Sequence, residues 1–216
     1  MRNTQPAYRT IARIAMSLVL ASAATVALEA AAPAARKGPD CPQVIASLLP
    51  KNGSIRGGSY NASGPMGLGS GAADLPFVHP CLKSEKFPAR ISVSVTYYGG
   101  EMAEMLKMQG GAANEQTLQN ALAELKRGKR VPRREKLAGG EIVYVDYTTE
   151  CPAEGAAGTG TVDRPPIPNV KLTGVALTAS VRLEVTLEGR IGVDQAKAAV
   201  AEVFENLKKA DFSKAR

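Results

Sequence analysis

The sequence predicts an α+β domain in which an antiparallel sheet carries helices packed on one face. Two segments alternate apolar and polar residues with the period of a half-buried strand, residues 91–98 and 179–188. The chain also closes with the apolar stripe of an amphipathic helix over residues 194–209. Strict alternation indicates one buried and one solvated sheet face, which is typical of antiparallel sheets. We therefore expect a single domain over residues 41–216.

The first half of this domain mixes short helices with one clear strand. Residues 42–49 predict a helix that ends at Pro50. Residues 52–73 are rich in glycine, which is costly inside strands, and predict an irregular edge strand or loop. After the 91–98 strand, residues 101–108 predict a helix that Gly110 and Gly111 break. A second helix then begins at the cap residue Asn114 and runs to about residue 127, with Leu118, Leu122 and Leu125 on one side.

The second half returns to strands. Residues 131–137 and 141–148 predict a hairpin around Gly139 and Gly140, with Pro132 placing the first strand at an edge. Residues 152–169 combine a Gly/Ala run with the later prolines Pro165, Pro166 and Pro168 and predict a long exposed loop. The 179–188 strand and the final helix follow.

The N-terminus has the pattern of an export signal. Residues 1–13 carry three arginines and no acid, residues 14–28 are uncharged and apolar, and small residues follow at 21–23 and 30–32. The apolar stretch is shorter than the roughly 20 residues that a spanning helix needs. We expect residues 1–30 to be a cleaved signal peptide and residues 31–40 a flexible mature N-terminus. The mature protein is then periplasmic or secreted, without an integral membrane span.

The chain has three cysteines, Cys41, Cys81 and Cys151. In an oxidising compartment this count predicts one disulfide and one remaining thiol. Three pairings are open, and the sequence does not choose among them.

The order of elements resembles the PsbP-like α/β sandwich and exported bacterial domains of unknown function. The segments that carry the resemblance are Leu48-Leu49-Pro50, the strand 91–98, Leu137-Ala138-Gly139-Gly140 before the strand 142–147, and residues 183–189 before the last helix. The resemblance implies a fold, and it passes on no site residue because such folds serve unrelated functions.

A basic segment at residues 126–136 is the main feature outside the predicted core. After residue 30 the chain has 24 Lys and Arg against 19 Asp and Glu, a net charge of +5. The basic segment has a net charge of +6, so the rest of this part of the chain has a net charge of −1. A concentrated cluster predicts contact with an anionic envelope component or another envelope protein, rather than nucleic acid. A solvated charged face is the alternative. The seven cations are Lys126, Arg127, Lys129, Arg130, Arg133, Arg134 and Lys136.

Two other chemistries are alternatives to this binding function. Met102, Met105 and Met108 repeat at helical spacing and, with His79, could hold Cu⁺, although Met also fills apolar cores. Cys81 lies two residues from His79, the sole histidine, and could be the nucleophile of a thiol-based enzyme. A histidine beside a disulfide is the simpler interpretation of that pair. We expect a non-enzymatic binding or scaffold domain and predict no cofactor.

Overall fold

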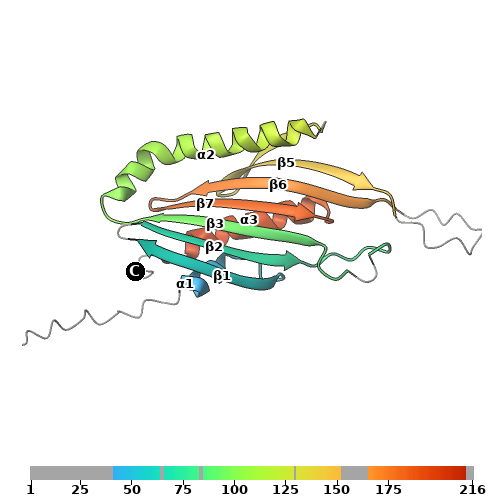
Figure 1. The fold of residues 1–216 in the computed structure, drawn as a ribbon, viewed down its shortest axis with the longest axis horizontal. Helices are drawn as coiled ribbons and strands as arrows, with labels where there is room; N and C mark the ends of the chain where they lie inside the picture. The colour runs from blue at the N-terminus through green and yellow to red at the C-terminus, as the bar shows by residue number, and fades with distance from the viewer. Residues whose placement is uncertain (1–40, 64–65, 83–84, 129, 152–164, 213–216) are drawn as a thin grey trace, which may run out of the picture. The chain divides into compact units, whose positions relative to one another are not determined.

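One antiparallel sheet of seven strands organises the chain (Figure 1). The structure is a computed structural model and describes residues 41–63, 66–82, 85–128, 130–151 and 165–212. In these ranges the strand order is β1-β2-β3-β7-β6-β5-β4, and every neighbouring pair is antiparallel. The α+β class, the antiparallel sheet and the single domain are confirmed. The strands are β1 (Ser54–Ser63), β2 (Met66–Leu75), β3 (Ala89–Tyr98), β4 (Arg133–Leu137), β5 (Gly140–Thr149), β6 (Ile167–Leu177) and β7 (Val181–Gly189).

The two predicted alternating strands, β3 and β7, lie side by side in the centre of the sheet. Their register pairs Ile91 with Leu187 and Val95 with Leu183, so the apolar residues of both strands share one face. A shift of one residue would turn this whole set toward solvent, so the hydrophobic pattern specifies the register.

Helices α1 (Cys41–Leu48) and α3 (Val193–Lys209) cover that apolar face. Phe204 and Val200 of α3 and Ile45 of α1 are fully or almost fully buried in one continuous core. The two helices also contact each other, because Asn206 Nδ2 donates to the backbone carbonyl of Leu48 at 3.3 Å.

Helix α2 (Met102–Arg127) lies on the opposite face, over β5 and β6. The alternation along β5 shows this directly, since Ile142 and Tyr144 belong to the core under α3 while Val143 and Val145 pack with Leu118 of α2. In this detail the structure differs from the prediction, which placed the helices on one face. The apolar cluster under α2 includes residues of β5 and β6 but none of β3 or β7. Strands β3 and β7 therefore keep the alternating pattern of a sheet that is covered on one face.

The glycine-rich segment forms two regular strands, β1 and β2, where an irregular edge or loop was predicted. The reason is the close approach of α1 and of the Tyr60 ring of β1. Side chains on the inner face of β2 would collide with neighbours, because the Cβ positions of Gly69 and Gly71 are occupied by Ile45 and that of Gly67 by the Tyr60 ring. Glycine in a strand often marks such an approach.

Two further predictions are wrong. Gly110 and Gly111 do not break a helix but lie inside the 26-residue α2, with Gly110 packed so closely against Leu106 and Leu177 that a Cβ there would require these side chains to shift. Strand β6 was not predicted, and its first residues, 167–169, were placed in the 152–169 loop. Residues 152–164 of that loop, the predicted signal 1–30 and the segment 31–40 lie outside the described residues. No helix in the described ranges is long and apolar enough to cross a membrane.

Candidate functional site

The basic segment does not form one continuous surface. Lys126 and Arg127 end α2, Arg130 lies in the connection to β4, and the remaining described cations are on β4 itself. Successive side chains of a strand point to opposite faces, so Arg133 points toward the α3 side while Arg134 and Lys136 point toward α2. Lys129 lies outside the described residues.

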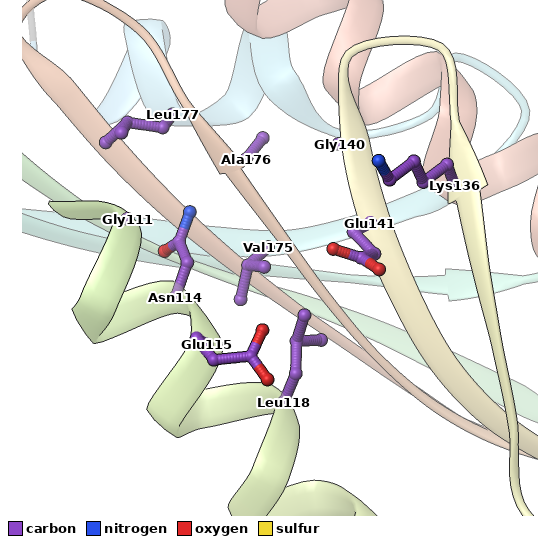
Figure 2. A pocket seen from close by; sticks show the side chains of 10 residues that line it. All are labelled: Gly111, Asn114, Glu115, Leu118, Lys136, Gly140, Glu141, Val175, Ala176 and Leu177. Carbon is purple, nitrogen blue, oxygen red and sulfur yellow. The ribbon is translucent and has the colours of Figure 1, made fainter.

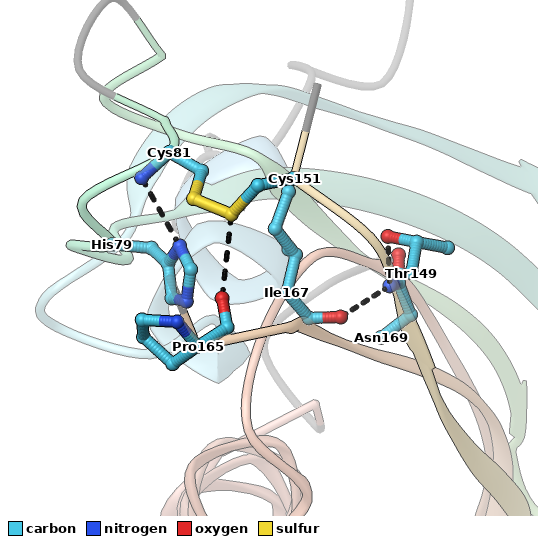
Figure 3. The surroundings of a disulfide bond; sticks show 7 residues. All are labelled: His79, Cys81, Thr149, Cys151, Pro165, Ile167 and Asn169. Atoms are coloured by element: carbon cyan, nitrogen blue, oxygen red, sulfur yellow. Dashed lines mark hydrogen bonds between the residues drawn. A yellow bond between two sulfur atoms is a disulfide. The ribbon is translucent and has the colours of Figure 1, made fainter. Parts of the chain in front are cut away.

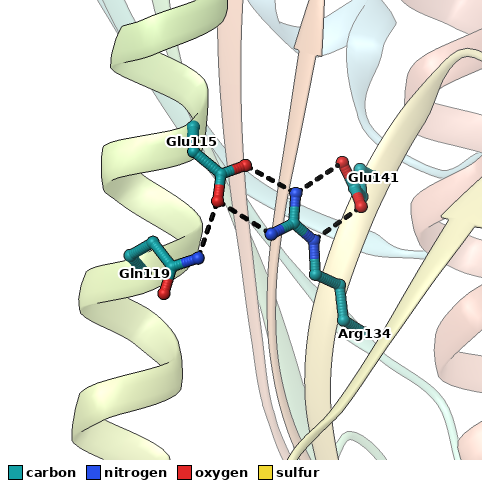
Figure 4. Close-up of polar contacts among 4 residues, drawn as sticks. All are labelled: Glu115, Gln119, Arg134 and Glu141. Carbon is teal, nitrogen blue, oxygen red and sulfur yellow. Dashed lines mark hydrogen bonds and ion pairs between the residues drawn. The ribbon is translucent and has the colours of Figure 1, made fainter.

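Arg134 joins α2 to the β4–β5 hairpin (Figure 4). Its guanidinium donates to both carboxylate oxygens of Glu115 on α2, at 2.9 and 2.6 Å, and to those of Glu141 on β5, at 2.6 and 3.1 Å. Gln119 Nε2 also donates to Glu115 at 2.7 Å. The hydrogen bonds from Arg134, followed by that from Gln119, lower the pKa of Glu115 to about 2. The charge of Arg134 is therefore balanced within the fold, and its geometry is that of a structural clamp.

The other cation of β4 at the α3 side is partly balanced as well. Arg133 Nη1 lies 3.7 Å from a carboxylate oxygen of Asp146, and both side chains are exposed, Arg133 more than Asp146. An exposed pair at this distance is weak.

Three cations at the end of α2 remain available, and we name Lys126, Arg127 and Arg130 the α2-end patch. All three are exposed, and none forms a salt bridge with a carboxylate of the described residues. The Arg130 guanidinium lies 3.4 Å from the centroid of the Tyr147 ring on β5. Stacking occupies the face of the guanidinium and leaves its N–H edges available for planar, bidentate hydrogen bonds to an anion.

A pocket of about 300 Å³ lies beside the Arg134 clamp, between α2 and the β4–β5 turn (Figure 2). Leu118 and Val175 form an apolar part of its wall, and Glu115 and Glu141 face each other across it. Both acids are already bonded to Arg134, and the Asn114 side chain accepts a 2.9 Å hydrogen bond from Arg182 Nε. Lys136, which pairs with Glu141 across the hairpin, is a third charged residue of the pocket wall, and a single lysine is too little to build a specific site.

Cys81, Cys151 and His79 lie together near the C-terminal end of β5 (Figure 3). Cys81 and Cys151 form a disulfide, with their Cα atoms 5.7 Å apart. His79 is buried next to it, and its Nδ1 accepts a hydrogen bond from the Cys81 backbone N–H at 3.2 Å. A disulfide sulfur is not a thiolate nucleophile, so Cys81 cannot act as one in this state. Cys41, the third candidate, begins α1 and is not part of this bond.

The methionines and His79 lie at opposite ends of the sheet. Met102 begins α2 just after the end of β3, which pairs with the start of β2 at Met66, whereas His79 follows the other end of β2. A ten-residue strand spans about 33 Å. Met105 and Met108 are exposed, so they contribute little to the core. The structure therefore does not bring His79 together with Met102, Met105 and Met108.

The cations could be identified from the sequence, but the carboxylates and the aromatic ring that contact them could not all be predicted. The side chains that contact these arginines are distant in sequence. Glu115 lies 19 positions and Glu141 7 positions from Arg134, and Tyr147 lies 17 positions from Arg130. In the predicted hairpin, residues 134 and 141 are diagonal neighbours on one face, because Arg134 pairs with Val143 and Lys136 with Glu141, so the Glu141 contact had a sequence signal. The contact between Arg134 and Glu115 of α2 had no such signal in the sequence.

No family model and no curated protein matches this chain. Among solved structures, the extracellular domain of PknH from Mycobacterium tuberculosis aligns over 77% of this chain and 90% of its own length, at 11% identity and a TM-score of 0.34. A likeness at this level says nothing about function. The PsbP-like resemblance stays a prediction.

Proposed function

We propose that this protein is an exported, non-enzymatic domain that binds a phosphate-bearing component of the cell envelope through the α2-end patch. The observation that carries the proposal is the contrast within the basic segment. Arg134 is balanced by two carboxylates, while Lys126 and Arg127 at the end of α2 and Arg130 in the connection after it have no salt bridge to the described residues. A cluster that served only to offset the helix dipole would need no aromatic residue beneath Arg130.

The export part of the proposal is supported by the N-terminal sequence and by the disulfide. A disulfide between residues 70 positions apart is typical of proteins that fold in an oxidising compartment. The three cations provide point charges and one oriented guanidinium, a combination suited to phosphate groups.

The test is binding of the purified protein to vesicles of phosphatidylglycerol and of phosphatidylcholine, with a triple variant Lys126→Ser, Arg127→Ser, Arg130→Ser. Each cation near an anionic surface contributes about 1 kcal/mol, so the variant should bind phosphatidylglycerol roughly 100-fold more weakly. Binding of the parent should fall as salt rises and should be absent on phosphatidylcholine.

The matched control is Lys51→Ser, Lys107→Ser, Lys209→Ser, which removes the same charge from three other exposed positions. Equal weakening by both triple variants would show a net-charge effect and contradict the patch. Soluble polyphosphate that competes with the vesicles would identify the phosphate group, rather than the lipid surface, as the ligand. No binding to either probe would contradict the proposed function.

A further inference from the structure

We propose that His79, Cys81 and Cys151 form a binding site for a thiophilic cation of the Zn²⁺ class, which opens when the disulfide is reduced. The three ligand atoms, one ring nitrogen of His79 and the two Sγ atoms, already lie within 4.8 Å of one another. A tetrahedral ion with Zn–S bonds of about 2.3 Å places two thiolate sulfurs about 3.8 Å apart. The thiolates therefore need only side-chain rotation to reach that separation.

The histidine lies beside the two sulfurs with an acceptor nitrogen on their side. Its Nδ1 accepts the Cys81 backbone N–H at 3.2 Å, and coordination of a metal through this lone pair replaces that hydrogen bond. The ring is buried and stacked on Phe77, with ring centroids 6.0 Å apart, which limits its rotation. Imidazole nitrogen is a common ligand of Zn²⁺ in proteins.

Hydrogen bonds also hold the two chain segments that carry the ligands, independently of the disulfide. On the first, the backbone N–H of the buried Leu82 donates to the His79 carbonyl at 2.9 Å. On the second, Asn169 Nδ2 at the start of β6 donates to Thr149 Oγ1 at 3.1 Å and to the Ile167 carbonyl at 2.9 Å (Figure 3). A reduced Cys151 thiol also has an acceptor, because the Pro165 carbonyl oxygen lies 3.3 Å from its Sγ.

The site forms in two steps, reduction of the disulfide and binding of the metal. A dithiol reductant transfers two electrons and two protons to the Cys81–Cys151 bond, which breaks into two thiols while the reductant becomes a disulfide. Zn²⁺ then displaces both thiol protons and accepts one lone pair from His79, giving a neutral three-ligand centre whose fourth position is open to water. Both cysteines are partly exposed, so the reductant can reach the bond.

The experiment uses the full chain with Cys41→Ser, so that the remaining two thiols are those of the proposed site. Zn²⁺ is titrated calorimetrically into the oxidised protein and into the protein reduced with a phosphine. We expect one Zn²⁺ per reduced chain and none per oxidised chain. His79→Gln should weaken binding by about tenfold or more, since changes even to groups that only support a ligand cost 10–100-fold.

Far-UV circular dichroism of the same samples covers the case in which reduction unfolds the chain. Zn²⁺ should then restore the fold of the reduced parent and should not restore that of Cys81→Ser, Cys151→Ser. The proposal is overturned if the reduced parent binds Zn²⁺ no more tightly than this double variant. It is equally overturned if His79→Gln binds like the parent, or if the reduced chain stays unfolded with Zn²⁺ present.

Discussion

The two faces of the sheet are held by different kinds of interaction. On the α1/α3 face, one apolar core runs from Ile45 of α1 through the centre of the sheet to Phe204 of α3. On the α2 face, a small seam around Leu118, Leu125 and Val143 supports the helix, and polar groups complete the contact. Because apolar burial is the main favourable contribution to folding, we expect the α1/α3 face to contribute more to the stability of the fold than the α2 face.

The polar contacts of α2 come from three strands. Arg134 on β4 holds Glu115, and Lys171 on β6 lies 2.6 Å from Glu124. Arg182 on β7 donates to Thr117 Oγ1 at 2.6 Å. Elements with few buried apolar contacts open at lower free energy than core elements. The α2-end patch and the pocket therefore belong to the less tightly packed half of the molecule.

The largest effect should come from the α1/α3 face. Phe204→Ala removes a ring that is 1% exposed and fills the space above Gly140 and Gly174, so we expect a loss of about 3–5 kcal/mol in the free energy of unfolding. Leu118→Ala, equally buried under α2, should lose about 2–3 kcal/mol because the small seam can partly close.

Urea unfolding measures both losses, and native-state hydrogen exchange separates them. Phe204→Ala should speed exchange throughout the sheet, and Leu118→Ala mainly in α2. Equal exchange in β3 and β7 of the two variants would contradict the unequal roles of the faces.

An intermediate effect should appear as a pH dependence of the α2 clamp. Arg134, acting first among its partners, lowers the pKa of Glu115 in the folded state from 4.5 to about 2. A lowered folded-state pKa contributes stability that is complete above the unfolded-state value and is lost as the pH falls, here between about 5 and 2. The melting temperature should fall over this range in the parent and fall less steeply in Arg134→Met.

Circular dichroism melts from pH 7 to pH 2 measure this difference. Lys136→Met is the control, because it removes a neighbouring cation on the same strand that has no salt bridge to the described residues. Parallel pH profiles for the parent and Arg134→Met would exclude the clamp as the source of the dependence.

The smallest effect should come from the uncovered part of the α2 face. Ser94 is exposed on β3, so Ser94→Val should change the free energy of unfolding by less than about 0.5 kcal/mol. Its neighbour Val93 is 2% exposed on the other face, and the isosteric Val93→Thr should cost about 1–3 kcal/mol because it buries a hydroxyl. Similar losses for the two variants, measured by urea unfolding, would erase the distinction between the faces.

Elements that are buried on one side only were easier to predict from the sequence than elements that are buried on both sides. Strands β3 and β7 and helix α3 have one apolar and one polar side, and the local pattern identified all three. Strand β6 packs under helices on both faces, so its burial does not alternate cleanly and it was missed. The alternating glycines of β2 were a signal for a strand under a close helix, but without Ile45 above them they resemble a loop.

The α+β class, the apolar face of the central strands and the concentration of cations at residues 126–136 could all be inferred from the sequence alone. These features are local, because they depend on residue type and on periods of two or 3.6 residues. The tertiary structure decided which face α2 covers, which cysteines pair and which cations are balanced by carboxylates. Those outcomes depend on residues such as Glu115, Tyr147 and Cys151, which only chain folding brings next to Arg134, Arg130 and Cys81.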